Sequence, residues 1–342
     1  MKKIFKTLLL GLLMAGPIAL MAQTLHVNRS DYHQSTYTFK APEVRINNHE
    51  IAGAMYTELV VDGSTPSTAV GKPNLPIISE MIEIPLCQNV KVEVTNVQTK
   101  VWGNLKYRMM PVQPAPSKSD RAPRVFELDA DCYAQNTFYA NELAWVDIMG
   151  VARDKNVAIL RVSPFSYNPI TGEVMQVVSM DIDITFEGAD VQATQQMHQR
   201  YYSPDFALGT RLLSQLPCSK EIRRAAPLHY LIVAHSSFRG QLDEFVAWKK
   251  RQGFIVTVGY TDDDNVGTTT TSIAAYTKSF YTNATAELPA PTYLLLVGDV
   301  AQIPAFNAQC VQPSTDHVTD LYYATWTDDN IPDCYYGRFP AS

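Results

Sequence analysis

The chain has few charged residues for its length, and it lacks an excess of basic ones. Of its 342 residues, 18% are charged, and 28 Lys and Arg stand against 34 Asp and Glu, which gives a net charge of −6. A nucleic-acid-binding protein usually presents a basic face, so this balance argues against that class of function. With 46% hydrophobic residues the chain can bury a core, and its length predicts two domains rather than one.

The charges that are present are unevenly distributed. Residues 1–224 carry 22 basic and 22 acidic residues, whereas residues 225–342 carry 6 and 12. The whole net charge therefore belongs to the second part, and the two parts differ in character.

Several sequence fingerprints are missing. There is no GxGxxG or Walker A motif, so nucleotide binding is not expected, and no GxSxG elbow or other nucleophile context stands near any of the seven histidines. We therefore assign no catalytic residue within 1–342. The cysteines form no CxxC pair, and their odd number and wide spacing do not make a disulfide framework. We expect most of them to be small buried hydrophobic residues: Cys87, Cys132, Cys218, Cys310 and Cys334.

The N-terminus has the pattern of a secretory signal peptide. Three lysines precede an apolar run over residues 8–20, and a small residue, Ala22, precedes a polar start. The run is short for a membrane span, and Gly16-Pro17 would break a spanning helix. No later stretch of about 18 apolar residues occurs. We expect residues 1–22 to be a signal peptide and the mature chain to have no transmembrane segment.

Residues 23 to about 190 show the alternation of short β-strands. Apolar and polar residues alternate over 90–94 and 180–186, and 157–162 is a third strand-like run. Turn signals such as Thr171-Gly172 separate such runs. This pattern predicts an all-β sandwich or a barrel-like domain.

The stretch from 190 to 227 is predicted to be a linker. It is polar and rich in Gln between Gln192 and Gln199. Arg223-Arg224, followed by small residues, is by its residues alone an ordinary solvated dibasic pair, with a processing site as the alternative.

The pattern changes to α/β from His229 onward. Apolar strands are predicted over 230–234, 254–258 and 293–297, as for strands buried on both faces. Amphipathic helices lie between them, the first with apolar positions from Phe238 to Val246 and the second from Ile273 to Phe280. This β-α-β-α-β order predicts a parallel sheet with right-handed crossovers.

Acidic residues of this second part stand where a metal can bind. Asp299 follows the strand 293–297, at the carboxyl end where parallel sheets form sites, although a turn or helix N-cap is the alternative role. Asp329 and Asp333 flank Ile331 on a short loop, and carboxylates and a carbonyl are the hard oxygen ligands that calcium takes. The EF-hand Gly and Glu are missing, so the residues alone favour a solvated acidic turn, with calcium as the alternative.

Eight motifs stand out in chain order: Gly71–Pro76, Tyr167–Gly172, Tyr230–Val233, Phe245–Phe254, Val266–Thr269, Leu295–Asp299, Val318–Tyr323 and Gly337–Phe339. Together they resemble the gingipain family, whose members are exported bacterial cysteine endopeptidases with a caspase-like fold. The first two resemble gingipain-type propeptides and the others the start of the catalytic domain. Two of these, 266–269 and 318–323, are similar to the lysine-specific branch. The resemblance covers nearly the whole chain after the signal.

The resemblance implies a domain division and a fold class. A β-rich propeptide over 23–224 would be followed, from 225 to 342, by the N-terminal part of a gingipain-like α/β catalytic domain, caspase-like and incomplete. It also implies that Arg223-Arg224 is the propeptide cleavage point.

The resemblance places the catalytic residues outside this chain. In gingipains the His of an Ala-His-Gly motif and the nucleophilic Cys both follow the Gly-Arg-Phe strand, which is Gly337–Phe339 here. No Ala-His-Gly occurs in this sequence, and Cys310 and Cys334 do not match the nucleophile's position. We therefore expect residues 1–342 alone to be inactive, and turnover abolished by iodoacetamide would refute this.

The resemblance also implies a structural calcium ion. By position, its ligands would be Asp299, Asp329, the carbonyl of Ile331 and Asp333. Thr327 stands where the lysine-specific relatives have Asp, so one carboxylate is lost.

Two functions follow as hypotheses. The first is the zymogen portion of a secreted gingipain-like cysteine endopeptidase that cleaves proteins or peptides, with a weak indication of cleavage after basic residues. Residues 23–224 would then be a partner of the catalytic domain in the same chain and would keep it latent. The protein would be secreted or lie on the surface of a bacterium. The alternative is a non-enzymatic gingipain-like surface protein or a secretion-system component.

Overall fold

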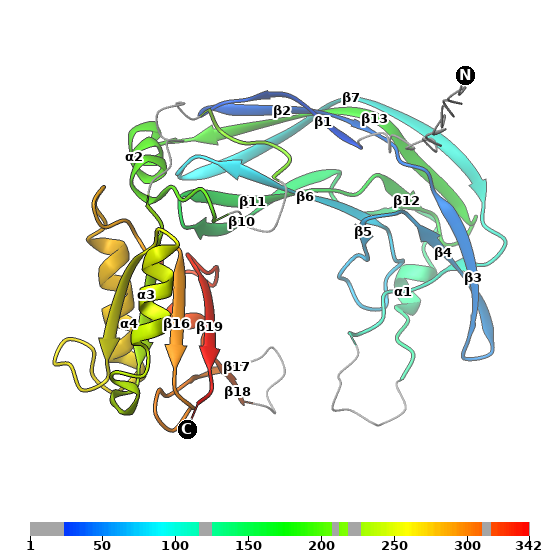
Figure 1. The fold of residues 1–342 in the computed structure, drawn as a ribbon. Coiled ribbons are helices and arrows are strands. Elements are labelled where there is room, and N and C mark those ends of the chain that lie inside the picture. The colour runs from blue at the N-terminus through cyan, green and yellow to red at the C-terminus, as the bar shows by residue number, and fades with distance from the viewer. Residues whose placement is uncertain (1–23, 116–124, 207–211, 218–226, 310–315, 342) are drawn as a thin grey trace, which may run out of the picture.

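The computed structural model describes residues 24–115, 125–206, 212–217, 227–309 and 316–341 (Figure 1). The predictions for the signal peptide, Arg223-Arg224, Cys218 and Cys310 lie outside these residues. Among the described residues, no helix is both long enough and apolar enough to cross a membrane.

The largest sheet of the β-rich part is centred on one long strand, β13 (Glu173–Glu187). It pairs antiparallel with β7 (Asn89–Asn104) on one side and with β2 (Gln34–Lys40) on the other. Alternate residues of β13 are buried from Met180 to Phe186, so the alternation that predicted strands over 90–94 and 180–186 is confirmed. The remaining strands of this sheet are β1 (Leu25–Ser30), β9 (Tyr139–Ala140) and β12 (Phe165–Tyr167).

A second antiparallel sheet shares its core with the first. Ile82 and Leu160 from this sheet lie in one hydrophobic cluster with Tyr37 and Met180 from the other, as in a β-sandwich. The predicted strand 157–162 lies in this second sheet. In order across it, the strands are β10 (Ala144–Ala152), β11 (Lys155–Val162), β6 (Ile77–Ile84) and β5 (Ser64–Thr65). A short helix and a three-stranded sheet complete this part: α1 (Ala130–Tyr133), β3 (Arg45–Ile51), β4 (Ala54–Val60) and β8 (Arg108–Met109).

The predicted linker contains a helix, α2 (Val191–Tyr201), so the prediction is wrong for these residues. The Asp190 carboxylate caps it by accepting the N–H of Ala193 at 2.8 Å. One face, formed by Thr194, Met197 and His198, is buried. The polar, Gln-rich composition concealed this face, because only one of its three residues is apolar.

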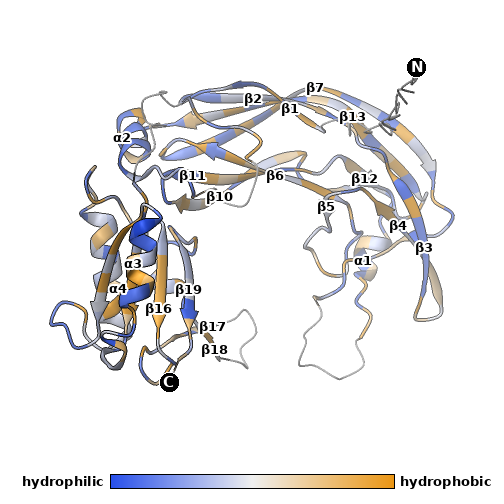
Figure 2. Cartoon of the chain, in the orientation of Figure 1, coloured by the Kyte–Doolittle hydropathy of each residue, from blue (hydrophilic) through white to orange (hydrophobic). Residues whose placement is uncertain are grey.

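The α/β part contains a four-stranded parallel sheet (Figure 1). Its central strands are apolar and buried, and β16 is mostly orange in Figure 2. The predicted parallel sheet is confirmed, and Gly337–Phe339 lies in its fourth strand. In order across the sheet, the strands are β15 (Ile255–Tyr260), β14 (His229–Ala234), β16 (Tyr293–Val297) and β19 (Tyr335–Phe339).

The two helices predicted between these strands are both present, but only one of them begins where its apolar pattern indicates. Helix α4 (Thr270–Thr282) contains the predicted apolar pattern from Ile273 to Phe280 and begins at a capping box formed by Thr269 and Ser272. Helix α3 (Asp243–Arg251) begins five residues later than the apolar pattern from Phe238 indicates, because the chain first forms a 3₁₀ turn and then adopts a left-handed conformation (φ +83°) at Gly240. The remaining elements are η1 (Ser236–Phe238), β17 (Phe306–Gln309), β18 (Asp316–Thr319) and η2 (Leu321–Tyr323).

A buried histidine, His229, is the first residue of β14. Its burial predicts that the stability of the chain depends on pH. His229 Nδ1 lies 2.9 Å from the carbonyl of Pro289 and Nε2 lies 2.9 Å from the Thr257 hydroxyl. These partners indicate that Nδ1 carries the proton and that Nε2 accepts. Burial lowers the pKa of His229 to about 4, below the value of about 6.5 expected in the unfolded chain.

Because the unfolded chain binds this proton more tightly, we expect stability to fall as pH decreases from about 6.5 to about 4. The contribution of His229 to the free energy of unfolding should fall by about 3 kcal/mol over that range. Urea titrations at several pH values would measure it, with His229→Gln as the reference that lacks the titrating group. Parallel pH profiles for the two proteins would contradict the assignment.

Candidate functional site

The tip of the β10–β11 hairpin inserts into the α/β part. Figure 1 shows these strands at the end of the β-rich part that faces it. Arg153, at the tip, has a left-handed backbone (φ +59°) and is 1% exposed. Its guanidinium donates to four backbone carbonyls, those of Pro291 (2.6 Å), Ala290 (2.9 Å), Asp333 (3.2 Å) and Tyr201 (2.6 Å). A cation is thus buried against carbonyl oxygens, three of which belong to the α/β part.

Burial is unfavourable for this guanidinium unless its donors are satisfied. Desolvation lowers the pKa of Arg153, and the carboxylates of Asp154 and Asp333 oppose that shift. The four carbonyl acceptors offset part of the desolvation penalty. Removing the side chain would leave those carbonyls without their donor in a buried interface.

The hairpin backbone is also recognised, through alternate residues. The N–H of Val151 donates to Asp329 Oδ2 and the N–H of Arg153 to Asp333 Oδ1, both at 2.8 Å. In the opposite direction, the Tyr281 hydroxyl donates to the carbonyl of Arg153 at 2.8 Å. The α/β part therefore binds both the main chain and the side chain of the turn.

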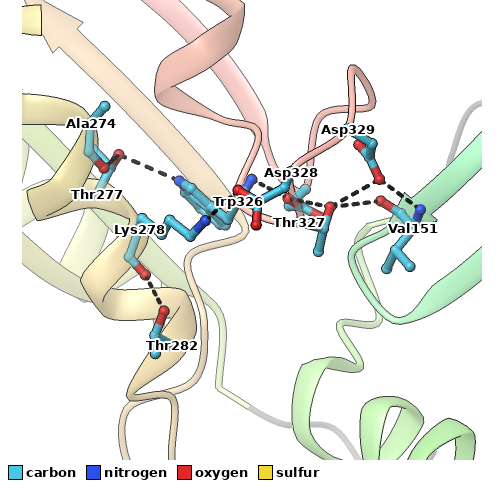
Figure 3. A network of polar contacts seen from close by, with 10 residues as sticks. Val151, Ala274, Thr277, Lys278, Thr282, Trp326, Thr327, Asp328 and Asp329 are labelled. Atoms are coloured by element: carbon cyan, nitrogen blue, oxygen red, sulfur yellow. Dashed lines mark hydrogen bonds and ion pairs between the residues drawn. The ribbon is translucent and has the colours of Figure 1, made fainter. Parts of the chain in front are cut away.

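Thr327 connects the hairpin to the acidic loop that precedes β19 (Figure 3). Its hydroxyl lies 3.1 Å from the carbonyl of Val151 and 3.1 Å from Asp329 Oδ2. It also lies 3.4 and 3.3 Å from the two carboxylate oxygens of Asp333. Two carboxylates thus meet at one hydroxyl, beside a guanidinium from the β-rich part.

Asp333 is the buried member of this pair of carboxylates, with 0% exposure. Desolvation raises the pKa of its carboxyl to about 6, while the N–H groups of Trp326 and Arg153 oppose the increase. Asp329 is half-buried, and its second oxygen accepts the N–H of Ile331 at 2.8 Å. Three of the four predicted calcium ligands therefore lie together on this loop.

The fourth predicted ligand, Asp299, lies at the other end of the sheet. Its N–H donates to the carbonyl of Ala341, beyond the carboxyl end of β19, whereas Asp333 precedes the amino end of that strand. Eight residues of extended chain between 333 and 341 span about 25 Å. Asp299 forms a turn, because its carbonyl accepts the N–H groups of Gln302 and Ile303. The turn role, named as the alternative for Asp299, is the one observed.

The predicted ligand set does not fit calcium as the chain is folded here. Without Asp299, the predicted set offers five oxygens: the Ile331 carbonyl and the four carboxylate oxygens of Asp329 and Asp333, each of which accepts a backbone N–H. Calcium takes six to eight oxygen ligands. Within the described ranges, no three His, Cys, Asp or Glu residues are grouped so as to hold a metal ion.

We therefore expect calcium to leave the melting temperature of this chain unchanged. The carboxylate oxygens of Asp329 and Asp333 already accept N–H groups from the hairpin and from the loop itself. Thermal unfolding in calcium and in excess chelator should give superimposable curves. A rise in calcium that Asp333→Ala removes, but that Asp328→Ala leaves, would instead support the calcium ligands inferred from the gingipain resemblance.

At the carboxyl end of the sheet, one arginine joins β19 to two loops. Arg338, in β19, forms a bidentate ion pair with Asp320 at 2.8 and 2.6 Å. Its remaining Nη donates to the carbonyls of Gly298 and Ile303, both at 2.9 Å. Parallel sheets place active sites at this edge, so Arg338 fixes the loops from which such a site is built. The sequence showed the strand but not this role.

The prediction for the cysteines can be compared with the structure. Cys334 is buried, as expected, and desolvation raises the pKa of its thiol. Cys87 and Cys132 are half-buried and form no disulfide. His235, which follows β14, caps the 3₁₀ turn by accepting the N–H of Ser237.

Comparison with known proteins agrees with this two-part architecture. Residues 25–202 match the C25 propeptide family model, and residues 223–342 match peptidase family C25. The chain belongs to this family: it combines a C25 propeptide with the start of a C25 peptidase domain. The gingipain resemblance and the predicted fold class, a β-rich part followed by a parallel α/β part, are confirmed.

Individual relatives come from Porphyromonas gingivalis. Lys-gingipain HG66 is 30% identical over 319 residues, which cover 92% of this chain and 18% of that protein. Gingipain R1 is 24% identical over 275 residues, covering 79% of this chain and 26% of that protein. A solved structure described as showing the zymogenic latency of gingipain K is 26% identical, with a TM-score of 0.45, and covers 48% of this chain and 93% of that one. The chain spans less than a fifth of the length of the Lys-gingipain relative.

Proposed function

We propose that this chain is the zymogen portion of a secreted cysteine endopeptidase, in which residues 23–224 keep the catalytic domain latent. The observation that carries the proposal is the Arg153 hairpin, which binds the first segment to the second through main-chain and side-chain contacts. If residues 23–224 merely preceded the peptidase domain in the chain, they would not need to bury the Arg153 side chain against that domain.

The Arg153 hairpin contacts the α/β part far from the edge at which catalysis would take place. It binds the amino end of the parallel sheet, whereas loops at the carboxyl end, held by Arg338, are where the fold places a site. In the complete enzyme a cysteine thiolate would attack the substrate carbonyl, with a histidine as general base and acid. The hairpin orients the β-rich part so that other segments of it can cover that edge.

The name of the Lys-gingipain relative supports cleavage of proteins or peptides after a basic residue as the proposed specificity. The basic and apolar N-terminus supports export, and we propose that the mature protein acts outside the cell or on its surface. The competing hypothesis is a non-enzymatic surface protein or secretion-system component.

Sequencing the coding region beyond Ser342 separates the two hypotheses. The endopeptidase requires an Ala-His-Gly motif and, farther on, a cysteine that follows a buried strand. A complete coding region without them would leave the non-enzymatic function as the better account.

A further inference from the structure

A second contact between the two parts of the chain lies at the end of α2. We call residues 200–206 the docking segment, because they cross the amino end of the parallel sheet. The rings of Tyr201 and Tyr281 stack with their centroids 3.9 Å apart, and the hydroxyls of Ser203 and Thr292 lie 2.9 Å apart in a buried position. Further contacts join Arg200 to the carbonyl of Thr282, Asp205 to the Tyr293 hydroxyl, and Phe206 to Tyr335.

Both ends of the chain around this segment are held by one carboxylate, that of Glu83 on β6. Glu83 is 0% exposed, and its Oε1 lies 2.7 Å from Nε2 of His198 on α2, which is 2% exposed. Its Oε2 accepts the N–H of Leu216 at 3.1 Å. Glu83 therefore contacts α2 before the docking segment and the chain that returns to the β-sandwich after it.

Main-chain hydrogen bonds hold the returning chain beside β6. The N–H of Glu83 donates to the carbonyl of Ser214 at 3.0 Å, and the N–H of Leu213 donates to the carbonyl of Met81 at 2.7 Å. Residues 213–216 thus run parallel to the second half of β6. The Glu83 side chain completes this pairing and connects it to α2.

The charge of Glu83 makes these contacts depend on one another. A buried carboxylate is unfavourable unless donors and positive charges surround it. Lys155 Nζ lies 3.6 Å from Oε2. Within the described ranges the ring nitrogens of His198 make no aligned hydrogen bond, so the approach to Oε1 is an electrostatic contact. Moving either α2 or Leu216 away would leave the carboxylate with fewer partners in a buried position.

We propose that Glu83 is a positioning residue for the docking segment: it fixes α2 and residues 213–216 on the β-sandwich, and so places residues 200–206 against the peptidase sheet. This inference rests on the proposed propeptide function, in which such contacts keep the peptidase domain latent. The two contacts are joined, because Arg153 Nε donates to the carbonyl of Tyr201 at 2.6 Å. Loosening the docking segment should therefore also weaken the hold on Arg153.

Hydrogen–deuterium exchange of the full chain, followed by mass spectrometry, tests this role. Glu83→Ala removes the acceptor of the Leu216 N–H and the carboxylate beside His198. We expect exchange to become about fivefold faster in peptides that cover 196–206 and 213–216, and about threefold faster in the peptide over 281–293 of the α/β part. The last peptide is decisive, because a role confined to packing inside the β-sandwich would leave its exchange unchanged.

Glu58→Ala is the matched control. Glu58 lies 2.8 Å from His49, so the pair has the same residue types at a similar distance, but it is partly exposed and joins β3 to β4. Its loss should change exchange in the three peptides by less than about 1.5-fold. Glu83→Gln keeps one acceptor oxygen and should give the same pattern at smaller amplitude, so it serves if Glu83→Ala does not fold.

Unchanged exchange over 281–293 in the folded Glu83 variant would overturn the proposal, and so would equal effects of the Glu83 and Glu58 substitutions. Neither measurement uses turnover. A failure of the endopeptidase hypothesis, which is tested on the complete precursor, would therefore remain distinguishable from a failure of this inference.

Discussion

Arg153→Ala should lower the free energy of unfolding of the chain by about 3–5 kcal/mol, in the range found when a buried charged partner is removed. The substitution leaves the carbonyls of Tyr201, Ala290, Pro291 and Asp333 without their common donor in a buried interface. It also leaves a cavity where the guanidinium was packed. Urea or guanidinium titration would measure the loss.

Arg161→Ala provides the matched control for this prediction. Arg161 also lies on the hairpin, but it forms a partly exposed ion pair with Asp147. Its removal should cost less than about 1 kcal/mol. Equal effects of the two substitutions would show that the Arg153 contacts do not hold the two parts together.

Gly150→Ala should disturb the same interface from the backbone side. A Cβ atom at Gly150 would lie 2.5 Å from Asp329 Oδ2, the oxygen that accepts the N–H of Val151. The residue also has a φ of +135°, a conformation that side chains rarely adopt. The clash and the strain together should cost about 2–4 kcal/mol.

Gly103→Ala separates the clash from the strain. Gly103 has a φ of +104°, but a Cβ atom there would meet no other atom within 4 Å. Its substitution should therefore cost only the strain, about 1–2 kcal/mol. Denaturant titration of both variants gives the difference, and limited proteolysis should detect loosening of the hairpin only in Gly150→Ala. A smaller loss for Gly150→Ala than for Gly103→Ala would contradict the close approach of Asp329.

The sequence predicted the fold where burial produces a regular pattern of apolar residues along a strand or helix. Alternation gave the strand inside β13, and an apolar run gave β16, because each strand must bury one or both of its faces. The prediction failed at α2, where the buried face includes Thr194 and His198. Polar residues on a buried face carry no hydropathy signal, so their burial depends on partners elsewhere in the chain.

The functional site was predicted less completely than the fold. The grouping of Asp329 with Asp333 is local and was visible in the sequence. Two of the backbone N–H groups that donate to these carboxylates, however, belong to Val151 and Arg153, about 180 positions away. No sequence pattern distinguishes Arg153 from an exposed turn arginine. Asp299 was assigned to the same site through family resemblance, but the register of β16 and β19 places it at the opposite end of the sheet.

The most direct test of the zymogen account is turnover by the complete precursor before and after removal of residues 23–224. Peptides with Lys or Arg at the cleavage position are suitable substrates, with iodoacetamide as the thiol probe. The account predicts little turnover by the intact precursor and strong, iodoacetamide-sensitive turnover once the propeptide is removed. Equal activity in both forms, or no thiol-dependent activity in the released domain, would contradict it.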